Sequence, residues 1–267
     1  MQDNGSWRGP AYIWRSQGIR NSYWQEISFG DGFDVIPDKD DSRYGWTMSQ
    51  QGFVSRYDWK TGNNYSVRPT HPESQINLRF NWNAAINIDP KANNIIYFGS
   101  QFVHKSTDKG ETWSIISPDL TTNNPKKLNQ HNSGGLTMDA TGAENHCTIL
   151  VIEPSEVEPD MLWVGTDDGR LHYTQNGGQD WTEVTKNIKG LPNGSWIPQI
   201  KASKSVKGEA LLVANDYRRF NFTPYVYRTK NYGKTWDRIV NASDVTSYAL
   251  SIVCLLYTSP SPRDIGP

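Results

Sequence analysis

The sequence predicts an all-β fold, and three observations predict it. An eight-residue motif, STDKGETW, stands at 106–113 and returns in altered form as TQNGGQDW at 174–181 and TKNYGKTW at 229–236. Short runs that alternate apolar and polar residues surround each copy, with Asp, Asn, Gly or Pro between the runs. No stretch of the chain gives a convincing helical pattern. These features indicate short antiparallel strands grouped into repeated units.

Four units of this kind follow one another along the chain. The first, at 33–67, has the rhythm of four strands but lacks the repeated motif. The second, at 83–117, predicts strands at 85–88, 95–98, 102–105 and 113–116. The third, at 146–185, and the fourth, at 196–240, repeat that order. Each unit therefore predicts a four-stranded antiparallel sheet with the motif between its third and fourth strands.

The spacing of the motif identifies the architecture. Trp113 and Trp181 lie 68 positions apart, and Trp181 and Trp236 lie 55 apart, more than the roughly 40 to 50 residues of an ordinary propeller blade. Two insertions, at 117–145 and 215–224, hold the excess. Serial four-stranded units predict part of a β-propeller. A β-sandwich is the alternative, but it does not explain why one turn recurs at the same place in successive units.

The repeated motif itself is interpreted as a structural turn. Its Asp or Asn oxygen is expected to accept backbone N–H groups two or three residues further on. Its Gly permits a positive φ at the sharpest point, and its Trp is expected to begin strand four and to be buried between blades. The positions assigned to this turn are Ser106, Asp108, Gly110, Trp113, Thr174, Asn176, Gly178, Trp181, Thr229, Asn231, Gly233 and Trp236.

Composition narrows the possible functions. The 267 residues carry a formal net charge of −1, which suggests neither a nucleic-acid nor an anionic-membrane partner. No apolar run approaches the roughly 18 residues of a transmembrane segment. The histidines are scattered, and His146 and Cys147 are expected to point to opposite faces of one strand, so no metal site or cofactor is predicted.

The acidic loop at 31–41 is interpreted as solvated. The dense tryptophans Trp7, Trp14 and Trp24 are interpreted as packing between blades, with sugar stacking as the alternative.

Both ends of the chain are interpreted as cut. Residues 1–253 are expected to form a partial propeller of about four to five blades. The segment CLLYTSPSPRD at 254–264 resembles the translation of a sequencing adapter, so 254–267 is excluded as a non-native tail.

The motifs also carry a family resemblance. STDKGETW is similar to the Asp-box of sialidases, sortilin-type propellers and xyloglucan-cleaving propeller enzymes. Most of residues 1–253 resembles large secreted bacterial propeller proteins described as sortilin-like or glycosyl hydrolase-like. The stretches QDNGSWRGP, RFNWNAAINIDP, HCTILVIEPS and LWVGTDDGRLHYTQNGGQDWTEVT carry that likeness. The resemblance implies a secreted or cell-surface location and a protein, peptide or carbohydrate partner.

Enzyme activity is the alternative that the resemblance raises. Xyloglucan-cleaving relatives place a catalytic aspartate between strands two and three of their first blade, where this chain has Ser49, Gln50 and Gln51. Amides and a hydroxyl cannot act as a general acid or base as a carboxylate does. The Arg triad and Tyr nucleophile of sialidases cannot be placed either. The sequence therefore favours a binding module over a glycoside hydrolase whose catalytic pair lies partly outside this chain.

A ligand site is predicted on the face opposite the repeated turns. Loops between strands two and three converge there around the propeller channel, together with the insertion after Asp119. Asp-Gly and Asn-Gly pairs in these loops are also preferred hairpin turns. The residues predicted to line one polar rim are Gln50, Gln51, Gln101, Asp167, Asp168, Asn215, Asp216 and Arg218.

Overall fold

The computed structural model describes residues 3–128 and 145–253. The adapter-like tail at 254–267 lies outside the described residues. Strands dominate the described part, and its single α-helix is the four-residue α1 (Pro125–Leu128). Four 3-10 turns accompany the strands: η1 (Asn21–Tyr23), η2 (Gln50–Gly52), η3 (Thr185–Asn187) and η4 (Tyr217–Arg219). The predicted all-β class is confirmed.

The strands form four antiparallel sheets of four, each in chain order, which we call blades 1 to 4. Blade 1 contains β3 (Val35–Pro37), β4 (Tyr44–Ser49), β5 (Phe53–Asp58) and β6 (Asn63–Ser66). Blade 2 contains β7 (Ile86–Ile88), β8 (Ile96–Gly99), β9 (Val103–Ser106) and β10 (Ser114–Ile115). Blade 3 contains β11 (Ile149–Pro154), β12 (Leu162–Thr166), β13 (Leu171–Thr174) and β14 (Thr182–Glu183). Blade 4 contains β15 (Trp196–Ala202), β16 (Ala210–Asp216), β17 (Asn221–Thr229) and β18 (Asp237–Val240).

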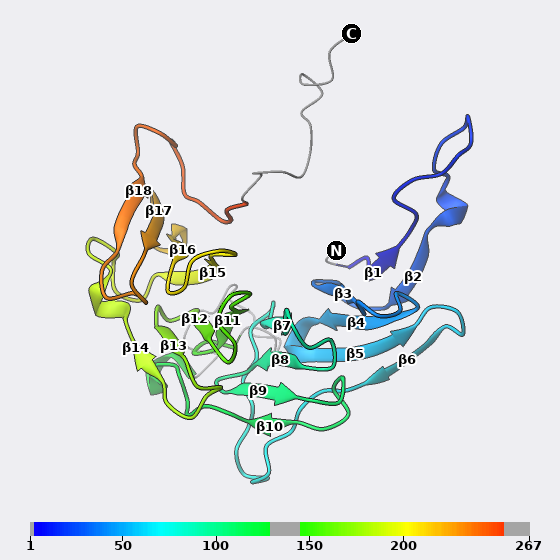
Figure 1. Ribbon diagram of the computed structural model, residues 1–267, viewed down its shortest axis with the longest axis horizontal. Coiled ribbons are helices and arrows are strands. Elements are labelled where there is room, and N and C mark those ends of the chain that lie inside the picture. Colours follow the sequence, from blue (N-terminus) through cyan, green and yellow to red (C-terminus); the bar gives the residue numbers. More distant parts are fainter. Residues whose placement is uncertain (1–2, 129–144, 254–267) are drawn as a thin grey trace.

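A two-stranded sheet precedes the four blades. It pairs β1 (Ser6–Arg8) with β2 (Gln25–Ser28) and lies beside blade 1, where Asn64 Nδ2 donates to the carbonyl of Ile27 at 2.8 Å. Figure 1 shows the sheets following one another around an arc, from β1 and β2 to β18. This arrangement is a partial β-propeller, as the sequence predicts.

The hydrophobic core lies between the blades. In β12, Leu162 and Val164 belong to the cluster shared with blade 2, whereas Trp163 belongs to the cluster shared with blade 4. In β8, Ile96 and Phe98 pack toward blade 1 in the same way. Successive side chains of a strand point to opposite faces, so the inner strands of a blade are apolar throughout because both faces are buried.

The repeated turns have nearly the same hydrogen bonds in blades 2, 3 and 4. Ser106 Oγ accepts the backbone N–H of Gly110 at 2.7 Å, and Asp108 Oδ1 accepts that of Thr112 at 2.9 Å. The glycine has a positive φ of 100°. The other two turns repeat both backbone bonds, with Thr174 and Asn176 in blade 3 and with Thr229 and Asn231 in blade 4. The prediction that the acceptor reaches two or three residues ahead was wrong, because it reaches four and so spans the whole turn.

The tryptophan of each turn lies just before strand four and packs against the preceding blade. Trp113 Nε1 donates to the carbonyl of Val67 at 2.7 Å, and Trp181 Nε1 donates to that of Ile116 at 2.9 Å. These two rings are half-buried, whereas Trp236 is 7% exposed and its indole N–H has no partner among the described residues. The turn is therefore a structural clip between neighbouring blades.

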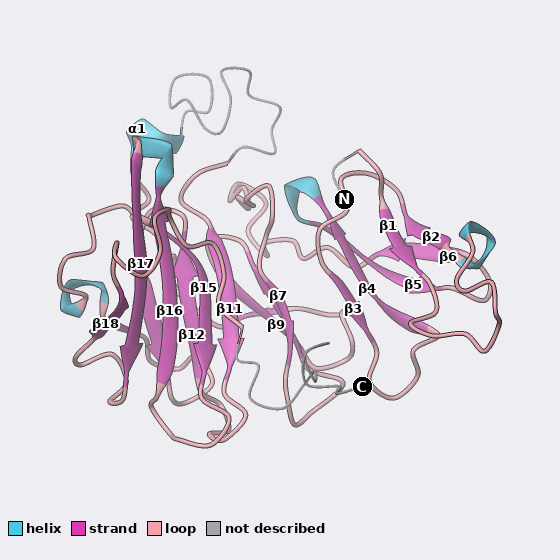
Figure 2. Ribbon diagram, turned by 90° about the horizontal axis from the view of Figure 1, so that it is seen from above, coloured by secondary structure: helices cyan, strands magenta, loops and turns pink. Residues whose placement is uncertain are grey.

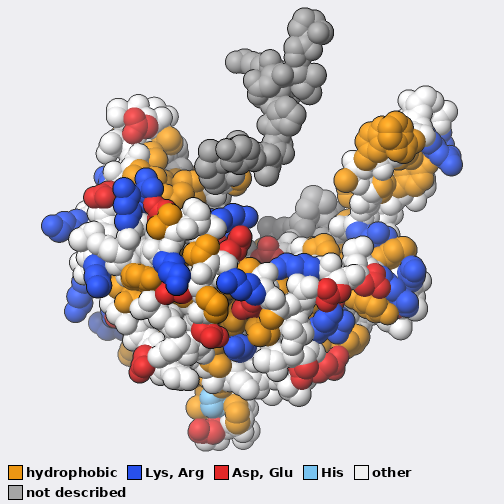
Figure 3. All heavy atoms as spheres, viewed as in Figure 1, with side chains coloured by type: hydrophobic (Ala, Val, Ile, Leu, Met, Phe, Trp, Pro, Cys, Tyr) orange, Lys and Arg blue, Asp and Glu red, His pale blue; other side chains and the backbone are white. Residues whose placement is uncertain are grey.

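Two expectations for the N-terminal part were wrong. The acidic loop is not wholly solvated, because Asp38 is buried and its carboxylate lies 2.7 Å from Lys109 Nζ of blade 2. The N-terminal tryptophans are not buried between blades. Trp14 is 91% exposed and makes an edge contact with the ring of Tyr12, in the segment that joins β1 to β2. Figure 3 shows hydrophobic side chains gathered where this β1–β2 segment projects from the molecule, at the upper right.

Candidate functional site

Topology brings two kinds of segment to one face of the propeller. Because the strands of each blade alternate in direction, the loops from strand two to strand three leave at the same edge as the linkers between blades. We call this the loop face. In Figure 2 it is the upper side, where α1 lies and where β16 and β17 are joined. The predicted rim residues all belong to loops of this face or to strand ends beside them.

Two adjacent aspartates stand at the base of the loop face, at the end of β12. Asp167 has no exposed surface, and it accepts hydrogen bonds from the N–H and Oγ1 of Thr148 and from Asn81 Nδ2 at 2.7–3.0 Å. Asp168 is 3% exposed and accepts bonds from Thr122 and Thr166. Asn81 lies in the linker between blades 1 and 2, and Thr122 and Thr148 lie in the linker between blades 2 and 3. The two aspartates therefore join both linkers to the β12–β13 loop.

The electrostatics of this base are unusual. Burial, and then the neighbouring Asp168 carboxylate, raise the pKa of Asp167 to about 7, although the hydrogen bonds from Thr148 and Asn81 oppose the shift. His146 Nδ1 lies 3.6 Å from Asp167 Oδ2. Burial, and then Lys127, lower the pKa of His146 to about 4, so this imidazole is neutral at physiological pH. Its Nε2 can therefore accept from Lys127 Nζ, which lies 3.1 Å away.

Arg218 is an exposed cation of the loop face. Its guanidinium carbon lies 3.4 Å from the ring centroid of Trp196 and 4.5 Å from that of Tyr217. Trp196 also lies near His146, with the two ring centroids 6.2 Å apart. Four side chains thus form a continuous series from the blade 2–3 linker to blade 4, which we call the cationic row: Lys127, His146, Trp196 and Arg218.

The remaining residues of the β16–β17 loop hold its shape. Asp216 accepts from Arg219 Nε at 2.5 Å and from Asn221 Nδ2 at 3.1 Å. Asp216 is 8% exposed, so its carboxylate is occupied by the loop itself. Phe220 takes a left-handed φ of 59° and is 88% exposed. Bulky residues seldom adopt this conformation, and it marks a loop whose shape is imposed by its surroundings.

The other predicted residues lie on the same face but at different depths. Gln50 Oε1 accepts the backbone N–H of Asp31 at 3.0 Å, and Gln51 has a left-handed φ of 61°. Gln101 is 2% exposed and connects the N–H of Arg79 to the carbonyl of Asn77. Asn215 is 2% exposed, and its Oδ1 has no partner among the described residues.

The structure also adds residues that the loop sequences did not indicate. Arg79 donates through Nη2 to Asp119 at 2.7 Å and through Nε to the carbonyl of Cys147 at 3.2 Å. His146 and Cys147 precede β11 in a bend, and Cys147 has a φ of 60°, so the expectation that they alternate across a strand was wrong. The strand order could have indicated these residues. In a four-stranded antiparallel blade, the linkers to the neighbouring blades lie on the same side as the loop between strands two and three.

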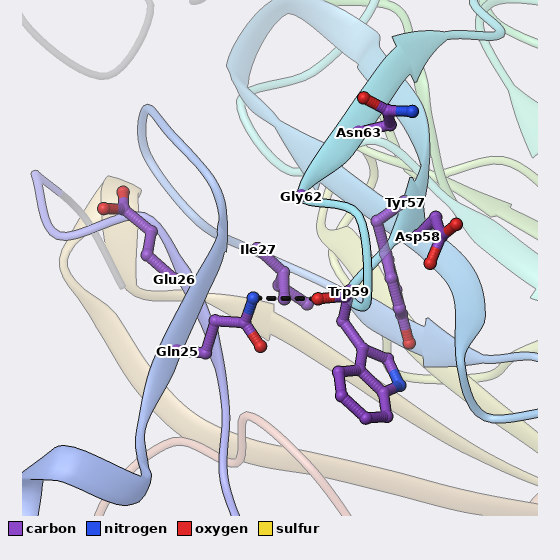
Figure 4. Close-up of a pocket in the computed structure, with 8 residues that line it drawn as sticks. All are labelled: Gln25, Glu26, Ile27, Tyr57, Asp58, Trp59, Gly62 and Asn63. Atoms are coloured by element: carbon purple, nitrogen blue, oxygen red, sulfur yellow. Dashed lines mark hydrogen bonds between the residues drawn. The ribbon is translucent and has the colours of Figure 1, made fainter.

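A hollow lies between β2 and blade 1, away from the loop face. Figure 4 shows the residues that line it. Gln25 Nε2 donates to the carbonyl of Trp59 at 2.9 Å across it, and the Arg8 guanidinium covers the Trp59 ring at 3.8 Å. These contacts join the two-stranded sheet to blade 1, which gives the hollow a structural role. Among residues 3–128 and 145–253, no group of three or more His, Cys, Asp or Glu side chains is placed to bind a metal.

Several solved structures are similar to this chain. A glycoside hydrolase family 74 enzyme of Niastella koreensis matches with a TM-score of 0.47 and 19% identity, over 78% of this chain and 30% of that one. A family 74 xyloglucanase of Xanthomonas campestris matches with a TM-score of 0.44 and 14% identity, over 90% and 43%. The structure of YCF48 bound to D1 peptide matches with a TM-score of 0.35 and 11% identity, over 79% and 69%.

The chain spans less than half the length of the two hydrolases that it matches. No protein-family model matches it, and no curated protein matches its sequence. In the described part of the chain, no helix has the length and apolar character needed to cross a membrane.

Proposed function

We propose that this chain is part of a secreted or cell-surface binding module that holds a ligand on the loop face of blades 3 and 4. The observation that carries the proposal is that two sets of side chains on this face differ in their exposure to a ligand. Asp167 and Asp168 are buried and hydrogen-bonded to the chain, whereas Arg218, Phe220 and Phe222 are exposed. An exposed cation beside exposed aromatic rings on a rigid scaffold is suited to recognition.

The buried carboxylates support binding by giving the face a fixed shape. The β12–β13 loop is attached through Asp168 to Thr122 and through Asp167 to Asn81 and Thr148. Linkers tied in this way hold the surrounding side chains in place before a ligand arrives, which lowers the entropic cost of binding. The family resemblance in the sequence supports a protein, peptide or carbohydrate as the ligand.

A glycoside hydrolase is the second candidate, and one observation favours it. The pKa of Asp167, raised to about 7 by burial, suits a general acid near neutral pH. Against this, Asp167 has no exposed surface, and three hydrogen bonds occupy its oxygens. A general acid must come within hydrogen-bond distance of the glycosidic oxygen, and Asn81 and Thr148 stand in the way.

The test compares the two faces of the propeller. The immobilised protein is screened against an array of peptides and glycans, and against xyloglucan with a reducing-end assay. The loop-face variant Phe220→Ser with Phe222→Ser is expected to lose binding at least 10-fold. A control variant, Lys230→Ser with Lys234→Ser, changes two side chains on a repeated turn of the same blade and is expected to bind within about twofold of wild type.

Two results would overturn the proposal. One is equal loss of binding in the two variants. The other is release of reducing ends from xyloglucan that disappears in Asp167→Asn, which would make the hydrolase the better description.

A further inference from the structure

We propose that the cationic row is a receptor for carboxylate groups of an acidic polypeptide, with Arg218 as the main contact and Lys127 as the second. This inference rests on the proposed function and specifies its ligand. The observation behind it is that Arg218 is immobilised by aromatic rings and not by an acid.

Other arginines of this part of the molecule are already neutralised. Arg219 pairs with Asp216, and Arg79 pairs with Asp119, each at 2.7 Å or less. Arg218 forms no salt bridge with any residue in 3–128 or 145–253, and the same holds for Lys127. Two cations without acidic partners on one face leave positive charge that a ligand can neutralise.

The geometry of Arg218 suits planar anions. Trp196 and Tyr217 contact the guanidinium, at 3.4 and 4.5 Å, so little rotamer freedom remains to be lost when a ligand binds. A guanidinium whose carbon lies 3.4 Å from a ring centroid can still direct N–H groups at its edges toward a ligand. Those edges match the two oxygens of a carboxylate, and such bidentate contacts are among the strongest that proteins make.

Lys127 is held in a similar manner. Its ammonium donates to the Nε2 of His146, and this requires the neutral imidazole that burial maintains. Within residues 3–128 and 145–253 the ammonium has no other acceptor, and its remaining two protons can be donated to a ligand. Since His146 contacts Trp196 and Trp196 contacts Arg218, the two cations belong to one continuous surface across the junction of blades 3 and 4.

The surroundings favour a polypeptide over an acidic glycan. The two rings that contact Arg218 offer no open face to a sugar, because Arg218 covers Trp196, and Tyr248 stacks on Tyr217 with ring centroids 4.6 Å apart. Beside them, Phe220 is 88% exposed and Phe222 is 52% exposed, which adds apolar surface. A chain that carries acidic side chains beside apolar or aromatic ones complements both the charge and this apolar surface.

The experiment uses two polymers of known chemistry. A labelled copolymer of glutamate and tyrosine represents the acidic polypeptide, and labelled polygalacturonate represents an acidic glycan. Binding to each is measured by fluorescence anisotropy at two salt concentrations. Wild type is expected to bind the copolymer more tightly than polygalacturonate, and the affinity is expected to fall as salt rises.

Three variants locate the contact. Arg218→Gln is expected to weaken copolymer binding at least 10-fold, and Lys127→Gln at least threefold. Arg218→Lys keeps the charge but loses the planar donor edge, so an intermediate loss is expected. The matched control is Arg228→Gln on β17 of the same blade, where Glu209 already neutralises the arginine, and it is expected to bind within twofold of wild type.

The outcomes separate this inference from the proposed function. If Arg218→Gln binds the copolymer as wild type does while the Phe220→Ser, Phe222→Ser variant does not, the loop face is a binding site but the carboxylate receptor is wrong. Arg218-dependent binding of polygalacturonate alone would overturn the polypeptide assignment. Absence of copolymer binding by wild type would overturn the inference outright. Circular dichroism of every variant confirms that a loss of binding is not a loss of fold.

Discussion

The indole N–H of Trp181 donates to the carbonyl of Ile116 at 2.9 Å, and this bond joins blade 3 to the residue that follows the last strand of blade 2, across 65 positions of the chain. Trp113 makes the equivalent bond to Val67. The repeated turn thus closes on itself through its hydroxyl and Asp or Asn, and it reaches the neighbouring blade through its Trp.

The first prediction concerns closure of the turn. Replacing Asp108 with alanine removes the acceptor for Thr112 N and Oγ1, and we expect unfolding to become easier by about 1 to 2 kcal/mol. Urea denaturation measures this change. The control is Asp237→Ala on β18, an exposed aspartate outside any repeated turn, for which we expect less than about 0.5 kcal/mol. Equal effects of the two substitutions would contradict the role assigned to Asp108.

The second prediction compares tryptophans that occupy equivalent positions. Trp181→Phe removes a satisfied N–H and leaves the carbonyl of Ile116 without this donor, so we expect a loss of about 1 kcal/mol beyond the packing change. Trp236→Phe removes a buried N–H that has no partner among the described residues, and we expect no such loss. The further loss from Phe to Leu at each position measures packing alone, so denaturation of the Phe and Leu variants separates the two contributions. A loss for Trp181→Phe no larger than its packing contribution would refute the prediction.

The third prediction concerns the ion pair between blades 1 and 2. Asp38→Ala leaves Lys109 without its buried partner and is expected to destabilise the protein by about 3 kcal/mol. Asp40→Ala is the matched control, because the Asp40 side chain is 58% exposed and lies 3.6 Å from the same ammonium. We expect it to cost less than about 0.5 kcal/mol. If both variants melted at the wild-type temperature, the buried pair would have no net role in stability.

The fourth prediction concerns acid sensitivity. Burial lowers the pKa of His104 to about 4 from an ordinary value of 6.5. In the unfolded chain this imidazole takes up a proton near pH 6.5, whereas the folded protein resists protonation. Its contribution to stability is therefore complete above pH 6.5 and is lost as the pH falls toward 4.

The variant His104→Leu should reduce the slope of the unfolding free energy against pH by up to about 1.4 kcal/mol per pH unit, which is the value for one proton. Free energies of unfolding measured every half pH unit test the slope, which is independent of any overall destabilisation. Asp167 contributes a slope of the opposite sign, since its raised pKa favours the folded state at low pH. Wild type and His104→Leu with identical slopes would show that His104 is not the group responsible.

Local chemistry made the blades predictable from the sequence. Alternation of apolar residues indicated the strands of blade 2, and the structure places β8 and β9 within one residue of the predicted ranges. The glycine of each turn was recognisable because a positive φ is costly for other residues. Burial was harder to predict. Trp14 and Asp38 lie where tertiary contacts, and not their residue type, decide exposure.

The side chains that surround the candidate site were less predictable. Strand order puts the loops that hold Asp168 and Arg218 at the same edge of their blades, and a ligand site there stays a prediction. Nothing in the sequence indicated that Asp168 would be enclosed by Thr122, or that Trp196 would support Arg218. Those pairs lie 46 and 22 positions apart, and they depend on how linkers and loops fold back over the strand ends. Side chains in linkers carry no periodic signal, so His146 could only be found in three dimensions.

The direction of the tryptophan contacts has a consequence for biosynthesis. In blades 2 and 3 the indole donor belongs to the later blade and the carbonyl acceptor to the earlier one. A chain that leaves the ribosome from its N-terminus therefore presents each acceptor before the matching donor is made. Blades 2 and 3 therefore each find the carbonyl acceptor for their tryptophan already synthesised.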